Sequence, residues 1–358
     1  VVGNASASLI DKNIESVGNG WYRCSITYNA TISQVRIFPA DGNGNVSGTS
    51  GNILIQNSQL EAGLIATDVI ETGASTAQAG ILEDMPRLDY SGGATCPSLL
   101  LEPQRSNLID DYSGYTWDEF NGASIAFNGN QQSPEGLDNA VTWTFSGTSG
   151  EVVQRSSITI SNSTTYTISG YFKLTSGTLS SGSNQLKGLD GLAGANVSLN
   201  TLTSEWQRLS FDVTSSSTTG RVQFRCDDSA TIKVYGLQLE AGCYVSSIIP
   251  TYGASVTRSH DVCKITGADA TDIINQPAMT LFVEAQLDDN GATTILSMLR
   301  DLTGGLYNDF ISLTYTNSLK VNFEVRENAS PQATIQSAVL SEGVHKIAAV
   351  LTSTSMKL

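Results

Sequence analysis

The stretch S-Q-L-E-A-G at Ser58–Gly63 returns as L-Q-L-E-A-G at Leu237–Gly242. A tryptophan precedes each copy, in G-W-Y-R-C-S-I-T around Trp21 and in E-W-Q-R-L-S-F-D around Trp206. The tryptophan lies 38 residues before the glutamine in the first copy and 32 before it in the second, a difference that one loop can absorb. After each copy, I-E-T-G-A-S at 70–75 corresponds to I-P-T-Y-G-A-S at 249–255. This internal repeat predicts two homologous domains.

The two copies differ in how much sequence comes before the tryptophan. The second begins at Asn107, 99 positions before Trp206, whereas 20 residues precede Trp21. We therefore predict the C-terminal part of a first β-sandwich at 1–76, a connector at 77–106 with a short helix-like piece from Ala77 to Met85, and a second sandwich at 107–256. A further, truncated sandwich is expected at 257–358. The start at Val1 and the apolar end of the sequence suggest a fragment, and a mature chain with a processed start is the alternative.

Apolar residues alternate along many short segments that are separated by clusters of Ser, Thr, Gly and Asn. Strict alternation is typical of β-strands with one buried face. The sequence thus predicts an all-β chain of tandem antiparallel sandwiches of jelly-roll type, with few short helices. The sets of alternating residues expected to share a face are Val141, Trp143 and Phe145; Tyr166, Ile168, Gly170 and Phe172; Leu209, Phe211 and Val213; Val222, Phe224 and Cys226; Ile232 and Val234; Leu281, Val283 and Ala285; Ile311, Leu313 and Tyr315; and Val321, Phe323 and Val325.

Charge and cysteine content exclude several classes of protein. Nineteen Lys and Arg against 34 Asp and Glu give a net charge of −15, which would repel a phosphate backbone, so nucleic acid is not an expected partner. We see no apolar run long enough to cross a bilayer and expect no membrane insertion. Five scattered cysteines are interpreted as isolated apolar side chains rather than as a disulfide frame or zinc site.

Residues 110–120 combine aromatic rings with carboxylates, a composition that suits glycan binding because rings stack on sugars and acids bond hydroxyls. We therefore take Tyr112, Tyr115, Trp117 and Asp118 as candidate carbohydrate-binding residues, with packing of the first strand of the sandwich as the alternative.

A second set of candidate residues belongs to the repeat motif. The tryptophans could form a stacking platform, but we favour their burial in the sandwich core, with each arginine paired to a carboxylate or strand end. The glutamates could bind a structural calcium ion, but a hydrogen bond that fixes the corner is favoured, so no metal or other cofactor is predicted. The residues of this motif are Trp21, Arg23, Gln59, Glu61, Trp206, Arg208, Gln238 and Glu240.

Catalysis has little support in the sequence. Only His260 and His345 are present, and neither belongs to a metalloprotease motif. There is no nucleophile elbow or phosphate-binding loop, and isolated acids such as Glu284 and Glu324 do not establish the paired carboxylates of a glycosidase. We predict that the protein is not an enzyme.

Two segments resemble a known group of proteins. P-R-L-D-Y-S-G-G followed by L-L-L-E-P-Q-R-S-N-L-I, within 86–109, is similar to a connector found in phage tail and virion structural proteins. The segment from Q-L-E-A-G to T-R-S-H-D-V, at 238–262, resembles the closing strand and exit of the same proteins. The resemblance implies carbohydrate-binding-module-like sandwiches, followed from Ala278 by a concanavalin A-like or laminin-G-like sandwich, and it transfers no catalytic residues.

The function that this resemblance implies is structural and adhesive. We expect a component of a phage virion, such as a tail fibre, made in the host cytoplasm, which contacts host surface glycans. The expected partners are other virion proteins and further copies of the chain, with a trimer favoured. Two alternatives stay open: an accessory binding region of a polysaccharide-degrading enzyme, and a purely architectural capsid or tail decoration protein.

Overall fold

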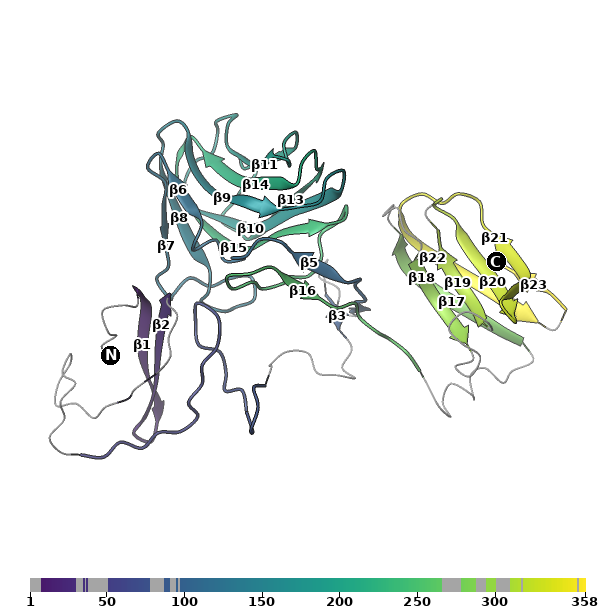
Figure 1. Cartoon of the computed structure of the whole chain (residues 1–358), viewed down its shortest axis with the longest axis horizontal. Helices are drawn as coiled ribbons and strands as arrows, with labels where there is room; N and C mark the ends of the chain where they lie inside the picture. The colour runs from purple at the N-terminus through teal and green to yellow at the C-terminus, as the bar shows by residue number, and fades with distance from the viewer. Residues whose placement is uncertain are drawn as a thin grey trace. The chain divides into compact units, whose positions relative to one another are not determined.

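The computed structural model describes residues 8–29, 35, 37, 51–77, 87–90, 95, 97–265, 278–287, 294–300, 310–316, 318–352 and 354–358. The chain divides into two compact units, Val1–Asp261 and Val262–Leu358. Every regular element in the described ranges is a β-strand, which confirms the all-β prediction (Figure 1). Those ranges contain no helix that could cross a membrane. Apart from Ala77, the predicted helix-like piece lies outside the described residues.

The centre of the first unit is a sandwich of two five-stranded antiparallel sheets (Figure 1). In both sheets spatial neighbours are often far apart in sequence, as expected for a jelly-roll-like arrangement. The first sheet has the order β13-β10-β15-β8-β7 and consists of β7 (Ser124–Ala126), β8 (Val141–Ser146), β10 (Thr165–Gly177), β13 (Gln207–Thr214) and β15 (Ser229–Ala241). The second has the order β12-β11-β14-β9-β6 and consists of β6 (Asp118–Phe120), β9 (Glu151–Thr159), β11 (Gln185–Asp190), β12 (Asn196–Ser198) and β14 (Thr219–Cys226).

An aromatic cluster fills the space between these sheets. The Trp143 ring is fully buried, and its centroid lies 5.2 Å from that of Phe224 and 5.7 Å from that of Trp117. The Trp143 indole nitrogen donates to the carbonyl oxygen of Gly114 at 3.2 Å. A Cβ at Gly114 would lie 2.7 Å from the ring, so only glycine fits there. The residues predicted to share a face in β8, β10 and β14 are all buried and form part of the core, and Cys226 lies among them, whereas Cys24 and Cys263 are exposed.

The connector is tied to the sandwich by short strands and by charge. Strand β3 (Leu88–Asp89) pairs with β4 (Ser98–Leu99), and β5 (Arg105–Asn107) pairs with β16 (Val256–Arg258). Arg87 contacts Glu102 at 2.5 Å and Asp261 at 2.6 Å, and Arg258 contacts Glu102 at 2.9 Å. We call Arg87, Glu102, Arg258 and Asp261 the connector ion cluster. It joins the two segments that carry the sequence resemblance, 86–109 and 238–262.

The first copy of the repeat forms a hairpin and an extended segment. Strands β1 (Ser8–Gly18) and β2 (Trp21–Asn29) are antiparallel, and Asn19 and Gly20 turn between them with φ of 51° and 79°. Two residues of positive φ are what a tight hairpin turn requires. The described segment 51–77 contains no strand.

The second unit also contains two antiparallel sheets. One has the order β17-β22-β23 and the other β18-β19-β20-β21. Leu313 and Phe323 are fully buried between apolar neighbours, as their alternation predicts. The strands are β17 (Ala278–Leu287), β18 (Thr294–Arg300), β19 (Phe310–Tyr315), β20 (Val321–Glu327), β21 (Ser330–Gln336), β22 (Gly343–Thr352) and β23 (Met356–Lys357).

Candidate functional site

The outer face of the second sheet of the sandwich is polar because its strands alternate. Val153 and Phe224 are fully buried on the inner face, so their chain neighbours Gln154 and Gln223 point outward. The register places Gln223 opposite Gln154 across β14 and β9. Phe120 of β6 lies opposite Val152 of β9 and extends the same face. Three strands that are distant in sequence thus contribute to one surface.

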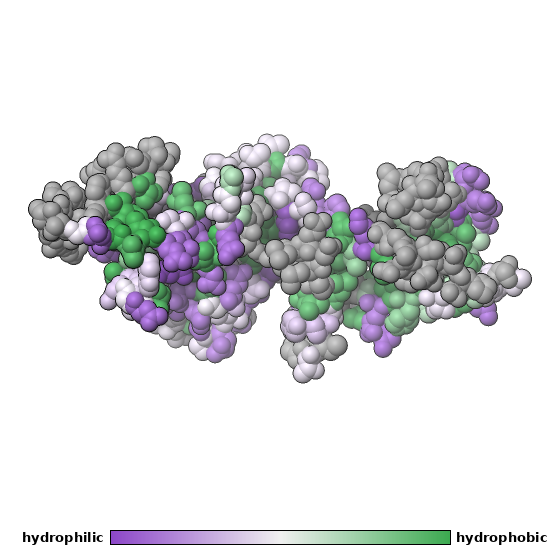
Figure 2. Space-filling model, turned by 90° about the horizontal axis from the view of Figure 1, so that it is seen from below, coloured by the Kyte–Doolittle hydropathy of each residue, from purple (hydrophilic) through white to green (hydrophobic). Residues whose placement is uncertain are grey.

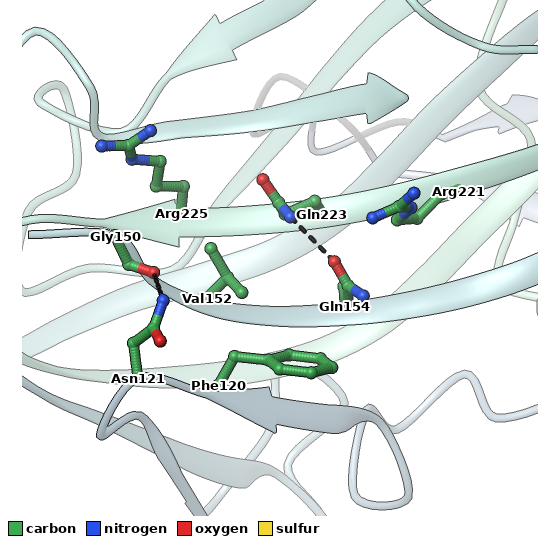
Figure 3. A pocket seen from close by; sticks show the side chains of 8 residues that line it. All are labelled: Phe120, Asn121, Gly150, Val152, Gln154, Arg221, Gln223 and Arg225. Carbon is green, nitrogen blue, oxygen red and sulfur yellow. Dashed lines mark hydrogen bonds between the residues drawn. The ribbon is translucent and has the colours of Figure 1, made fainter. Parts of the chain in front are cut away.

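This surface contains a groove of about 360 Å³. Phe120 is 44% exposed and offers an apolar ring at one side of the groove. Arginine side chains lie on the β14 side, as Figure 3 shows. The residues that line the groove are Phe120, Asn121, Gly150, Val152, Gln154, Arg221, Gln223 and Arg225.

A pair of amides forms the polar floor of the groove. The Gln223 Nε2 donates to Gln154 Oε1 at 2.8 Å, and Gln154 Nε2 donates to Ser156 Oγ at 3.1 Å. Both glutamines are less than a tenth exposed, so these bonds fix the orientation of each amide. In Figure 3 the side-chain oxygen of Gln223 points away from Gln154. Polar groups held in place before a ligand arrives lose little conformational entropy when it binds.

The arginines of the groove are balanced by carboxylates. Arg225 donates through Nε and Nη2 to Asp227, both at 2.9 Å, and Arg221 donates in the same two-pronged way to Asp190 at 3.0 Å. The hydrogen bonds from Arg225 lower the pKa of Asp227 to about 2. Nearby Lys187, opposite Gln223 in the register, has a pKa lowered by burial and by Arg225. With its guanidinium charges paired, the groove suits an uncharged, hydroxyl-rich ligand better than a phosphate.

The predicted carbohydrate-binding residues do not form a shared platform. Tyr112 and Trp117 are buried, so neither ring has a face for a sugar, and the prediction is wrong for both. Trp117 donates to the Asp111 carbonyl at 3.1 Å and packs on Trp143, so it belongs to the core. Tyr115 is half-buried, with its ring 6.4 Å from that of Phe127. Asp118 is exposed and lies opposite Gln154, on the face that carries the groove.

The repeated tryptophans are not the core tryptophans. Trp21 is 39% exposed, and Trp206 is half-buried just before β13. The interpretation of both as core plugs is therefore wrong, and Trp117 and Trp143 are the buried pair.

The arginines of the repeat motif have different partners in the two copies. Arg23 donates to the carbonyl oxygen of Thr67. Arg208 donates to Ser169 Oγ at 3.2 Å, and its guanidinium lies 5.3 Å from the centre of the Tyr171 ring. Neither arginine is among the residues that line the groove.

The glutamine and glutamate of the repeat motif form a hydrogen-bonded corner in both copies. Gln238 donates to Glu240 at 2.9 Å, Ser246 donates to Glu240, and the Ile249 amide donates to Gln238. In the first copy Gln59 donates to Glu61 at 2.9 Å, Thr67 donates to Glu61 at 2.6 Å, and the Ile70 amide donates to Gln59 at 2.7 Å. Although burial alone would raise the pKa of Glu61, the Thr67 hydrogen bonds lower it. No cluster of three or more metal-ligating side chains occurs among the described residues.

Sequence reasoning missed the residues of the groove. A signal was present in R-V-Q-F-R at 221–225, where long polar side chains alternate with buried apolar ones. Such alternation indicates an outward face rich in hydrogen-bonding groups. It does not reveal that Phe120 and Gln154 lie beside that face.

Comparison with known proteins gives similarity of fold only. No family model matches the chain, and no curated protein matches it in sequence. Among solved structures, the CBM22-1 xylan-binding domain of Xyn10C from Paenibacillus barcinonensis has a TM-score of 0.28 and 17% identity, over 38% of this chain and 92% of that domain. The CBM22-1–CBM22-2 tandem of the same protein has a TM-score of 0.26 and 14% identity, over 72% and 86%. The tripod from the baseplate of bacteriophage Tuc2009 has a TM-score of 0.25 and 11% identity, over 71% and 99%.

The strand order of its sheets defines this chain as an all-β protein of tandem antiparallel sandwiches. Its similarity to carbohydrate-binding modules and to a phage baseplate protein is distant.

Proposed function

We propose that the protein is a structural and adhesive component of a phage particle, and that the groove of the second sheet binds an uncharged glycan. The observation that carries the proposal is the combination within one groove of an exposed ring, Phe120, and the fixed amide pair of Gln154 and Gln223. A pyranose has an apolar face that packs on an aromatic ring and a rim of hydroxyls that bond to amides. Both surfaces of a sugar thus find a complement in the groove.

We propose binding without catalysis at this site. None of the eight residues that line the groove is a carboxylate, and the nearby Asp190 and Asp227 are held by arginines. Glycoside hydrolysis commonly needs two carboxylates that flank the bond to be broken. The groove supplies hydrogen bonds and a stacking surface instead.

The place on a phage particle is supported by the resemblance of 86–109 and 238–262 to segments of virion proteins. The connector ion cluster gives those segments a shared structural purpose, because it fixes the entrance to the sandwich beside its exit. Sandwiches joined in this way would act as rigid spacers that present a binding face.

Replacing Phe120 by alanine is expected to weaken glycan binding by about tenfold or more, because the ring provides the apolar contact at the groove. Titration calorimetry on the full chain, with the neutral polysaccharide that binds best in a glycan panel, measures the effect. Tyr90→Ala is the matched control, since Tyr90 is also an exposed aromatic residue and does not line the groove. Equal weakening by both changes, or no binding to any neutral glycan, would contradict the proposal and favour a purely architectural function.

We further propose that the chain works as a homo-oligomer, with a trimer favoured. Weak individual glycan contacts become effective when several copies bind together, and closed symmetry protects exposed sheet edges. Multi-angle light scattering of the purified chain is expected to give a mass about three times that of the 37.9 kDa monomer. A monomeric mass over the whole accessible concentration range would argue against this part of the proposal.

A further inference from the structure

The two copies of the repeat correspond residue by residue over their last strand and corner. Adding 179 to a residue number in the first copy gives its equivalent in the second, so Gln59 corresponds to Gln238. The equivalent residues Asn57 and Gly236 both have positive φ, of 55° and 67°. In the second copy Gly236 lies at the irregularity in the pairing of β15 with β10. The first copy thus has the same backbone feature at the same position.

Strand β1 is the equivalent of β10. Strand β2 pairs antiparallel with β1, and β13 pairs antiparallel with β10. Aligning the tryptophans of the repeat makes Tyr22 of β2 the equivalent of Gln207 of β13. Ser16 stands opposite Tyr22, and Phe172 stands opposite Gln207. Ser16 of β1 therefore corresponds to Phe172 of β10.

Only one edge of β1 is paired among the described residues. Strand β10 pairs with β13 on one edge and with β15 on the other, whereas β1 pairs with β2 alone. The first-copy equivalent of 232–240 in β15 is 53–61, which we call the closing segment. It pairs with no strand in the described part of the chain. A two-stranded hairpin is marginally stable in water without a third strand or other packing.

The closing segment and the hairpin both expose apolar side chains. Ile55 is 56% exposed and Leu60 is 74% exposed, although their equivalents Val234 and Leu239 are fully buried. Ile14 of β1 is 67% exposed. Figure 2 shows a hydrophobic patch at the left, on the side where Figure 1 places β1 and β2. Bringing such side chains together removes apolar surface from water and is favourable.

The corner that follows the closing segment already contacts the hairpin. Thr27 Oγ1 of β2 donates to the carbonyl oxygen of Leu64 at 3.0 Å, and Arg23 of the same strand also donates to this corner. In the second copy Thr167 of β10 donates to the carbonyl oxygen of Gly242 at 2.9 Å, so that corner is held by the equivalent pair of strands. The closing segment is thus tethered beside the hairpin, which raises its effective concentration there.

We propose that the closing segment adds to the free edge of β1 in the register of β15 on β10, which gives the first copy a three-stranded sheet. Ser16 would then stand opposite Ile55, as Phe172 stands opposite Val234. An open strand edge is a template for pairing with another chain. Closure therefore decides whether the first copy presents an open edge to other molecules. This inference concerns a different surface from the glycan groove and does not depend on it.

One pair of side chains opposes closure. In the second copy Thr167 stands opposite Glu240. Their equivalents are Asp11 and Glu61, so two carboxylates would face each other. Like charges directly opposite each other destabilise a pair of strands. We therefore expect the closing segment to open more readily than β15 does.

A cysteine pair tests the register directly. In a Cys24→Ser background, Ser16→Cys with Ile55→Cys is expected to form a disulfide about tenfold or more faster than Ser16→Cys with Leu54→Cys, because only directly opposite residues bring their Cβ atoms within reach. Leu54 is the matched control, since it is adjacent in sequence and its equivalent Lys233 points to the other face of the sheet. Ile55 and Leu54 are both exposed, so neither change is expected to disturb folding.

Amide hydrogen exchange of the unmodified chain tests closure without any substitution. Exchange within 53–61 is expected to be slower by about tenfold or more than in a free peptide of the same sequence, at every protein concentration. Strand β15 is the internal reference and should exchange more slowly still.

Two kinds of result would overturn the inference. One is equal rates of disulfide formation in the two cysteine pairs, or exchange within 53–61 as fast as in the free peptide, since either would mean that the segment does not pair with β1. The other is protection of 53–61 that rises with protein concentration, because a second copy of the chain would then supply the pairing strand.

Discussion

Trp143→Ala is expected to lower the free energy of unfolding of the first unit by about 3–5 kcal/mol. The ring is fully buried at the centre of the sandwich and contacts Trp117, Phe172 and Phe224, so its removal leaves a cavity that these rings cannot fill. The change also leaves the carbonyl oxygen of Gly114 without the hydrogen bond from the indole. Denaturant unfolding of the full chain, followed by circular dichroism, measures the loss.

The control for this prediction is the tryptophan that the repeat makes conspicuous. Trp206 is half-buried and lies outside the aromatic cluster, so Trp206→Ala should cost clearly less than Trp143→Ala. Equal losses for the two variants would mean that the core is not centred on Trp143. A larger loss for Trp206→Ala would restore the interpretation in which the repeated tryptophans plug the core.

The strands could be predicted from the sequence because their signal is local. Apolar and polar residues alternate at Val141, Trp143 and Phe145. A strand with one buried face produces this two-residue alternation whichever strands it later pairs with. The repeat could be predicted for a similar reason, since Q-L-E-A-G is long enough to be seen twice. In both copies the glutamine of this motif donates a hydrogen bond to the glutamate two residues later.

Burial of particular side chains was predicted less well, because it depends on what covers a strand. A repeated tryptophan shows that two positions are equivalent, but it does not show that either is enclosed. The copies differ most in this respect, since Leu239 is fully buried and its equivalent Leu60 is largely exposed. The predictions for Tyr112 and Trp117 were wrong in the opposite direction, because a loop-like composition did not reveal that both rings are buried. Trp117 packs into the core of the sandwich, and Tyr112 packs against Tyr235 and Tyr252.

The groove could not be predicted because no local pattern contains it. Its residues come from 120–121, 150–154 and 221–225, which become neighbours only through the order β14-β9-β6 of the second sheet. The connector ion cluster has the same origin, since Arg87 and Asp261 are 174 positions apart. Long-range strand pairing therefore determines both the candidate binding surface and the contacts that hold the connector.

Glu102→Ala is expected to lower the free energy of unfolding of the first unit by about 1–3 kcal/mol, the cost of removing charge-assisted hydrogen bonds from part-buried partners. Glu102 contacts Arg87 and Arg258 and also accepts from the Ser247 amide at 2.8 Å. The side chain is only 10% exposed. Its loss would leave Arg258 without a carboxylate partner and Arg87 with Asp261 as its remaining carboxylate, so the contact between the connector and the exit of the sandwich should weaken.

The pH dependence of stability provides an independent check on Glu102. Burial alone would raise its pKa, but the hydrogen bonds from Ser247 and Arg87 outweigh burial and lower the pKa below the ordinary 4.5. A carboxyl whose pKa is lowered by folding stabilises the protein above its unfolded pKa, and this stability is lost as the pH falls through the folded pKa. The wild-type chain should therefore lose more stability than Glu102→Gln when acidified from neutral pH, because glutamine does not titrate.

Glu205→Gln is the matched control, because Glu205 is an exposed carboxylate of the same unit and should change stability by less than about 0.5 kcal/mol. The connector ion cluster would be judged unimportant if Glu102→Ala behaved like this control, or if Glu102→Gln kept the full acid sensitivity of the wild-type chain. If both expectations hold, Glu102 is a main contact between the two segments that resemble virion proteins, beside the Arg87–Asp261 ion pair. Their common occurrence would then have a physical reason, because neither 86–109 nor 238–262 could hold the entrance to the sandwich beside its exit without the other.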